Sequence, residues 1–376
     1  MRSIFIVACL CAAGCRGGGQ GIEDLQGAGG AGGAGGAGGA GGAGGSADAG
    51  ADGGVCDTPQ TDFPPCPLAP AGSFPVEVTG WQNADNANRV GPSVAYAYEN
   101  GDLFGNPDVE QILLGRLARG AALAPAGLSG EQATLWAWSA QGDWHPLGEA
   151  TTDERGYYRV GLGAADQFGT GDHVAYAVFP ADGSCAPHGV FLWPTGTQVI
   201  VTDIDGTLTL ADAELTRQIG DPTYVPRENA SAPELMRAWA EKGYKIIYLT
   251  ARPHTFRLQT RTWLELKGVP YGPIITANSL VFGESARVYK RDAIQRIVDE
   301  LGWDLVAAYG NAASDIQAYE DAGHPKDRTF IIGEEAGASG TVAVPDNDYA
   351  SHIQTYVARQ PDARQPATLV DTPYCR

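Results

Sequence analysis

The chain has 376 residues and a formal net charge of −19. This length is enough for two domains with a sizeable core. The acidic balance argues against nucleic acid as a partner and offers no general attraction to an anionic membrane surface.

The first 15 residues are typical of an export signal. Arg2 precedes an apolar run over 4–10, and the sequence Ala-Ala-Gly before Cys15 resembles a bacterial lipobox, although Ala12 stands where Leu is usual. The apolar run is too short to span a membrane. We therefore expect an exported bacterial lipoprotein of the cell envelope (outer membrane or surface), held at the membrane through lipidated Cys15. The alternative is an ordinary secretory signal and a secreted protein.

Residues 16–54 predict a flexible tether, because six copies of Ala-Gly-Gly fill residues 28–45 and cannot bury a core. Four cysteines follow the signal: Cys56, Cys66, Cys185 and Cys375. An even number in an exported chain suggests two disulfides, with three pairings open. We favour Cys56–Cys66 with Cys185–Cys375. None of these four cysteines belongs to a Cys-x-x-Cys pair, so we do not expect a zinc site.

Residues 55–197 predict a small all-β sandwich, immunoglobulin-like or transthyretin-like. β-branched and aromatic runs at 133–139, 157–162 and 173–179 read as strands separated by turn signals. A short helix is expected near 107–119. His145, His173 and His188 are scattered, which favours structural or surface roles over metal ligation.

Residues 198–360 alternate between strand and helix patterns, which predicts a three-layer α/β domain with a parallel sheet, followed by a tail at 361–376. The expected strands are 198–202, 244–250, 304–310 and 329–333, and the expected helices are 231–243, 254–267, 290–302 and 313–323. Ser231 and Glu234 form a capping-box pattern. In such sheets the site lies outside the carboxyl ends of the strands.

The stretch "VIVTDIDGTLT" at 199–209 places Asp203 and Asp205 directly after the first of these strands. Two carboxylates beside a buried strand repel one another. Such a pair is expected where a bound cation offsets the repulsion or where a reaction requires both groups. Further polar residues take matching places: Thr250 ends the next strand in "YLTARP", Lys290 opens a helix, and Asn311 and Asp315 follow a strand in "YGNAASD". Each alone is an ordinary cap, turn or surface residue, but their common place at one sheet edge points to a site.

The chemistry that suits this set is phosphoryl transfer through an aspartyl phosphate. One carboxylate attacks phosphorus, and the second protonates the leaving alkoxide and later activates water. Mg²⁺ is the cation expected among these oxygens. Lys290 would add a fixed positive charge, and Thr250 a hydroxyl donor to the phosphoryl oxygens.

The motifs "DIDGTLT", "YLTAR", Lys290 and "GNAASD" resemble the four motifs of the haloacid dehalogenase superfamily of phosphatases, over about 198–335. A finer resemblance is to the lipin-type phosphatidate phosphatase domain. The resemblance implies Asp203 as nucleophile and Asp205 as general acid and base. It implies that Thr250 and Lys290 hold the phosphoryl group, with Arg252 and Gly206 also at the substrate. It also implies a Mg²⁺ site built from Asp203, Asp205, the Ile204 carbonyl, Asn311 and Asp315.

The expected substrate is a phosphate monoester, and the finer resemblance favours phosphatidate, which would yield diacylglycerol. About 20 residues near 210–230 remain for a lid, so an open site is expected. Residues 251–296 hold eight Lys and Arg against three acids, a local excess that suits an anion as well as it suits two ordinary helix faces. A phosphomonoesterase for soluble phosphates and a non-catalytic lipid-binding or adhesion lipoprotein are the alternatives. The oligomeric state stays open.

Overall fold

The computed structural model describes residues 74–364, apart from 90–100, 122–123, 140–141, 222–223 and 280. The predicted signal with Cys15 and the tether lie outside this range, as do Cys56, Cys66 and Cys375, so the pairing of the cysteines stays a prediction. Cys185 is fully buried. Among the described helices, none has the length and apolar character needed to cross a bilayer.

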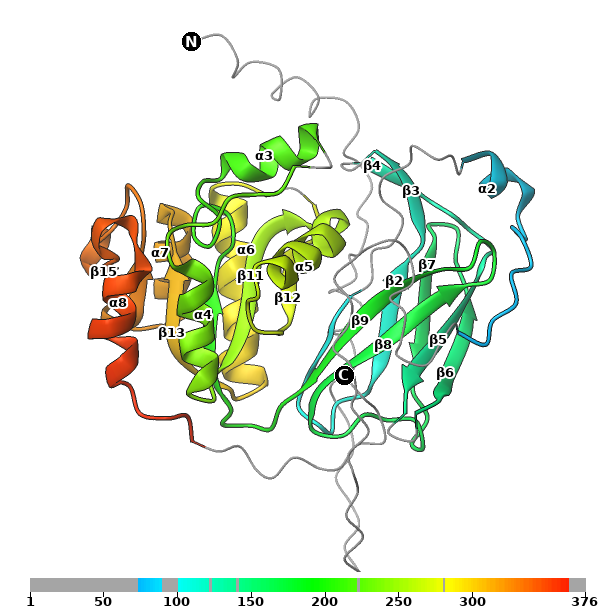
Figure 1. The fold of residues 1–376 in the computed structure, drawn as a ribbon, viewed down its shortest axis with the longest axis horizontal. Coiled ribbons are helices and arrows are strands. Elements are labelled where there is room, and N and C mark those ends of the chain that lie inside the picture. The colour runs from blue at the N-terminus through cyan, green and yellow to red at the C-terminus, as the bar shows by residue number, and fades with distance from the viewer. Residues whose placement is uncertain are drawn as a thin grey trace, which may run out of the picture. The chain divides into compact units, whose positions relative to one another are not determined.

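The first half of the described chain is rich in strands (Figure 1). After α2 (Ala84–Arg89), the strands are β1 (Leu103–Gly105), β2 (Ile112–Arg116), β3 (Ala118–Ala121), β4 (Ala124–Gly127), β5 (Gln132–Trp138), β6 (Trp144–Thr151), β7 (Tyr157–Gly161), β8 (Gly171–Phe179) and β9 (Ser184–Leu192). One sheet has the order β1-β9-β8-β5-β6, and β2-β7 and β3-β4 form two shorter sheets. The predicted β region is therefore confirmed, whereas its immunoglobulin-like or transthyretin-like arrangement stays a prediction.

Alternation along β5 shows why this region folds into layers. Ala133, Leu135 and Ala137 are fully buried in one hydrophobic cluster, and Trp136 between them is only partly buried. The helix expected over 107–119 is wrong, because β2 and β3 occupy that segment. The first four residues of β2 are all buried, and a short continuous apolar run cannot be told from a buried helix by its periodicity.

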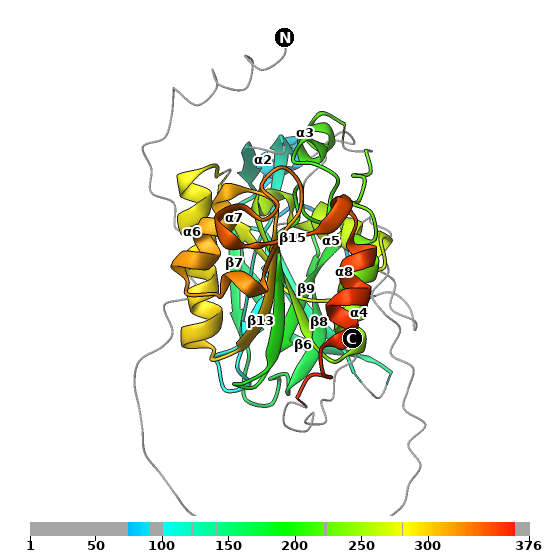
Figure 2. The same ribbon diagram turned by 90° about the vertical axis from the view of Figure 1, so that its left-hand side faces the viewer.

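The second half is the predicted α/β unit, with a parallel sheet in the order β12-β11-β10-β13-β14-β15. Its strands are β10 (Gln198–Thr202), β11 (Lys245–Pro253), β12 (Ile274–Ala277), β13 (Asp304–Gly310), β14 (Thr329–Ile331) and β15 (Val342–Ala343). Its helices are α3 (Ala213–Gly220), α4 (Ala232–Glu241), α5 (Arg257–Leu266), α6 (Glu284–Gln295), α7 (Ala313–Asp321) and α8 (Tyr349–Thr355). Figure 2 shows α6 and α7 on one side of β13, and α4 and α8 on the other.

The side chains of successive residues in β10 pack on opposite faces of this sheet. Ile200 packs in the cluster formed with α4 and α8, whereas Val199 and Val201 pack in a second cluster with α6. The second cluster also contains Phe104 and Phe191, which come from β1 and β9. The β-rich part and the α/β part thus share buried apolar surface, which the sequence did not predict.

Two local predictions in the α/β part are wrong. Ser231 has φ 59° and its side chain makes no cap hydrogen bond, while Glu234 pairs with Arg237 at 2.7 Å, so the capping box does not form. The helix expected to open at Lys290 begins at Glu284, after Gly283 with φ 52°. Lys290 consequently lies in the middle of α6, on its buried side.

Candidate active site

The predicted site residues meet at the carboxyl edge of the parallel sheet. The strands β11, β10 and β13 are direct neighbours there. Asp203 and Asp205 follow β10, Thr250 and Arg252 lie near the end of β11, and Asn311 follows β13. Because the carboxyl ends of parallel strands open at one edge, residues far apart in sequence are brought together.

Lys290 joins two of the carboxylates. Its ammonium donates to Asp203 Oδ1 at 2.7 Å and to Asp315 Oδ1 at 2.6 Å. The Lys290 and Asp203 side chains are 4% and 5% exposed, and that of Asp315 is 0% exposed. A buried charge is tolerated when it is paired and hydrogen-bonded, and this triad meets that condition for Lys290.

The electrostatics of the triad reflect the crowding of negative charge. Burial raises the pKa of Asp203 to about 7, Lys290 works against this, and the nearby Asp315 and Asp205 add to the rise. Burial alone would lower the pKa of Lys290, but Asp203 and Asp315 raise that pKa above its usual value. Lys290 is therefore a fixed positive charge in this site.

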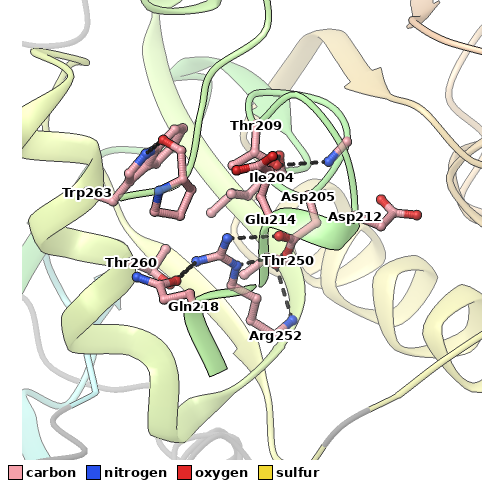
Figure 3. A network of polar contacts seen from close by, with 12 residues as sticks. Ile204, Asp205, Thr209, Asp212, Glu214, Gln218, Thr250, Arg252, Thr260 and Trp263 are labelled. Carbon is pink, nitrogen blue, oxygen red and sulfur yellow. Dashed lines mark hydrogen bonds and ion pairs between the residues drawn. The ribbon is translucent and has the colours of Figure 1, made fainter. Parts of the chain in front are cut away.

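Asp205 is held by groups from β11. Arg252 Nε donates to Asp205 Oδ2 and Arg252 Nη2 donates to Asp205 Oδ1, both at 2.8 Å (Figure 3). The Thr250 hydroxyl donates to Asp205 Oδ2 at 3.4 Å and accepts from the Arg252 backbone N–H at 3.2 Å. Thr250 and Arg252 thus contact the predicted acid and base in this structure, instead of pointing at a substrate position.

In the turn after Asp203, the Ile204 carbonyl and the Gly206 N–H make hydrogen bonds within the turn, although a metal and the substrate were their expected partners. The carbonyl oxygen of Ile204 accepts from the backbone N–H groups of Thr207, Leu208 and Thr209 at 2.9–3.3 Å, so its geometry does not favour metal ligation. The N–H of Gly206 donates to Thr209 Oγ1 at 3.0 Å, which removes it as a substrate donor. Within the described part of the chain, the next carbonyl, that of Asp205, accepts no hydrogen bond.

Asp315 and Asn311 have different neighbours. Asp315 Oδ2 accepts from the backbone N–H groups of Asn311 and Ala312 at 3.1 Å each, and its other oxygen accepts from Lys290. Its two oxygens are therefore occupied, and Asp315 orients Lys290 more directly than it offers a metal ligand. Asn311 Oδ1 instead accepts from Thr207 Oγ1 at 3.2 Å, and its amide nitrogen donates to Asp212 Oδ1 at 3.2 Å.

Sequence reasoning missed several residues of the site. Thr207 Oγ1 contacts Asp203 Oδ2 and Asn311 Oδ1, and its place directly after "DIDG" is the signal that could have revealed it. Asp212 lies beside Asn311, and burial raises its pKa, as do Asp205 and Asp315. Asn229 donates to the carbonyls of Gly206, Thr207 and Thr209 at 2.8–3.0 Å, and no local pattern marks it.

The oxygen donors present fit a hard cation in part. Asp203 Oδ2 and Asn311 Oδ1 both lie 3.2 Å from the Thr207 hydroxyl, so a carboxylate and an amide oxygen, both ligand types that suit a hard cation, are neighbours of one group. Within the described part of the chain, no three His, Cys, Asp or Glu side chains form a ready metal cluster. A site that uses Asn311 and a main-chain oxygen does not need such a cluster. The ionisable side chains of the site are four carboxyl groups and two cationic groups: Asp203, Asp205, Asp212 and Asp315 with Lys290 and Arg252.

Part of this chain is similar to a domain of known proteins. Residues 200–333 match a model of the LNS2 domain of PITM 1-3, which is lipin-like. The human membrane-associated phosphatidylinositol transfer protein 3 is 27% identical over 255 residues, 67% of this chain and 25% of that protein. Drosophila melanogaster protein retinal degeneration B is 27% identical over 219 residues, 56% of this chain and 16% of that protein. The chain therefore spans a quarter or less of these relatives.

Among solved structures, apo phosphoserine phosphatase covers 43% of this chain and 99% of its own, at 14% identity and a TM-score of 0.32. A likeness this weak adds nothing to the fold described above. The relatives also correct one expectation. They are animal proteins, and those of human and mouse are named as membrane-associated, so the prediction of an exported bacterial lipoprotein is wrong.

Proposed function

We propose that residues 198–360 form a Mg²⁺-dependent phosphatase that hydrolyses a phosphate monoester through an aspartyl phosphate. The observation that carries this proposal is the placement of Lys290 between Asp203 and Asp315, with Asp205 beside Asp203 at the edge of the sheet. The buried ammonium neutralises part of the charge on the nucleophile and on an incoming phosphate.

The reaction follows from the positions of the two carboxylates. A carboxylate oxygen of Asp203 attacks phosphorus, the ester P–O bond breaks, and the leaving alkoxide takes a proton from Asp205. In the second step Asp205 takes a proton from water as the water oxygen attacks phosphorus. The bond between phosphorus and Asp203 then breaks, which releases inorganic phosphate and restores both side chains.

Asp203, Asn311 and the Asp205 carbonyl are the groups that would hold Mg²⁺. A bound Mg²⁺ would supply positive charge to the phosphoryl oxygens and reduce repulsion between them and the carboxylates. Lys290 donates to Asp203 Oδ1 and would add its own positive charge at the phosphoryl group, and Asp315 keeps Lys290 in place.

Phosphatidate is the proposed substrate. The support comes from the lipin-like LNS2 match and from relatives whose names describe phosphatidylinositol transfer. Short connections around α3 leave little chain for a large cap, which suits a headgroup that protrudes from a lipid surface. The same names also favour a second candidate, a domain that binds an anionic phospholipid without turning it over.

The test uses the full chain. Phosphate release would be measured from phosphatidate in mixed micelles and from soluble phosphomonoesters, with and without Mg²⁺. We expect Mg²⁺-dependent release mainly from phosphatidate, and a loss of at least about a thousandfold in Asp203→Asn, because the nucleophile is removed. Asp292→Asn is the matched control, since Asp292 is exposed on α6 and pairs with its neighbour Arg291.

The other outcomes separate the candidates. Release from soluble esters alone would keep the mechanism and reject phosphatidate. Binding of phosphatidate vesicles without turnover of any ester would replace the phosphatase by the binding domain. Equal activity in Asp203→Asn and the parent chain would reject the aspartyl phosphate.

A further inference from the structure

Arg252 is enclosed by the protein on the site side of β11. Its side chain is 0% exposed. Its Nε and Nη2 atoms donate to the two carboxylate oxygens of Asp205, each over 2.8 Å, and so form a bidentate pair. A guanidinium matches the plane of a carboxylate in this geometry, so the pair fixes the orientation of the carboxylate as well as its position.

The third nitrogen ties this pair to two helices. Arg252 Nη1 donates to Thr260 Oγ1 on α5 at 3.1 Å and lies 3.4 Å from Gln218 Oε1 on α3 (Figure 3). Four of the five guanidinium N–H groups therefore have acceptors. A residue that is buried and occupied in this way cannot also reach a phosphate in solution.

We propose that Arg252 is a positioning residue, which acts through Asp205 and holds its carboxylate in the place from which it takes a proton from water. This inference rests on the proposed function and deepens it. Among the described residues, Arg252 is the one cationic side chain paired with Asp205. The paired form corresponds to the stage after the leaving group has gone, when the aspartyl phosphate awaits water.

A second consequence concerns the segment between β10 and α4. Gln218 lies on α3, and α3 is anchored by Glu214, whose side chain is fully buried and accepts from Arg227 and Tyr224. Displacement of α3 removes one anchor of Arg252 and so loosens Asp205. The short helix thus contributes to hydrolysis of the intermediate without contacting the reacting atoms.

The experiment separates formation of the phosphoenzyme from its hydrolysis. Full-length Arg252→Gln would be assayed for kcat and KM, and its phosphoenzyme trapped by acid quench with labelled substrate. We expect the phosphoenzyme to accumulate and to hydrolyse about 100-fold more slowly. Because only this step is slowed, kcat and KM should fall together, and kcat/KM should stay within about twofold. Arg252→Lys keeps the charge but not the fork, and recovers only part of the rate.

Arg237→Gln is the matched control, because Arg237 is a surface arginine on α4 paired with Glu234. Thr260→Val and Gln218→Ala remove one anchor each and leave Arg252 in place. We expect each to slow hydrolysis of the phosphoenzyme by about three- to tenfold, the size of one modest hydrogen bond. If Arg252→Gln does not fold, these two variants test whether Arg252 acts by positioning Asp205.

A higher KM with unchanged kcat in Arg252→Gln would overturn the inference and return Arg252 to substrate binding. Slower formation of the phosphoenzyme with normal hydrolysis would overturn it as well. Absence of any phosphoenzyme in the unmodified chain with Mg²⁺ would reject the proposed function, and the inference with it.

Discussion

At the scale of single residues, the site depends on close approaches that a side chain would prevent. Gly206 has φ 72°, and an added Cβ would lie 2.1 Å from Asn311 Nδ2 and 2.6 Å from Asp212 Oδ1. The turn after Asp203 can therefore bring Asn311 near only because this position has no side chain.

We predict that Gly206→Ala both destabilises the protein and damages the site. The left-handed backbone conformation costs about 1–2 kcal/mol for a residue with a Cβ, and Asn311 must move as well. Activity should fall by more than tenfold. Gly161→Ala in β7 is the control, since its Cβ would meet nothing within 4 Å. Equal losses of activity in the two variants would contradict this account.

At the scale of elements, the sequence predicted most of the parallel sheet but only part of the site. The strand at 198–202 and the strand at 304–310 were predicted with the bounds that β10 and β13 have. Their apolar runs are followed by polar residues whose position at strand ends is a local signal. Asn229 and Gln218 could not be predicted, because their partners lie far away in sequence and no local pattern links them.

The junction between β9, α5 and β12 depends on one buried carboxylate. Asp102 is 5% exposed, accepts from the backbone N–H groups of Gly189 and Ile274, and pairs with Arg257 and Arg261. The side chains joined here come from the β-rich part and from the α/β part. Removal of the negative charge would leave two buried guanidinium groups without their counterion.

We therefore predict that Asp102→Asn lowers the free energy of unfolding by about 3–5 kcal/mol, the usual cost of breaking a buried pair. Urea unfolding followed by circular dichroism measures this. Asp362→Asn is the control, because that carboxylate is 87% exposed and should show no measurable change. A loss confined to one part of the chain, seen as two transitions, would mean that the junction does not couple the two parts.

At the scale of the whole molecule, two buried histidines contribute to the response to acid. His188 Nδ1 lies 2.8 Å from the Gly101 carbonyl and therefore donates to it, so its other nitrogen accepts from Tyr158. Burial lowers the pKa of His188 to about 4, and burial likewise lowers the pKa of His352 to about 4.

The sign of the effect follows from the protons bound. The unfolded chain takes up a proton at each histidine near pH 6.5, and the folded chain resists until about pH 4. The contribution of these two histidines to the free energy of unfolding should be constant above about pH 6.5. It should fall by up to about 3 kcal/mol for each histidine as the pH drops to about 4. His188→Gln should remove about half of this slope, because His352 keeps its own share. An unchanged slope in His188→Gln would refute the assignment.

The shared hydrophobic cluster has a consequence for synthesis of the chain. The ring of Phe104 packs 6.5 Å from that of Trp303, and Phe104 in β1 pairs with Phe191 in β9. A ribosome makes nearly 200 further residues between the first member of the aromatic pair and the second. Phe104 therefore reaches its final packing only after Trp303 has been made, so this face of β1 is completed late in synthesis.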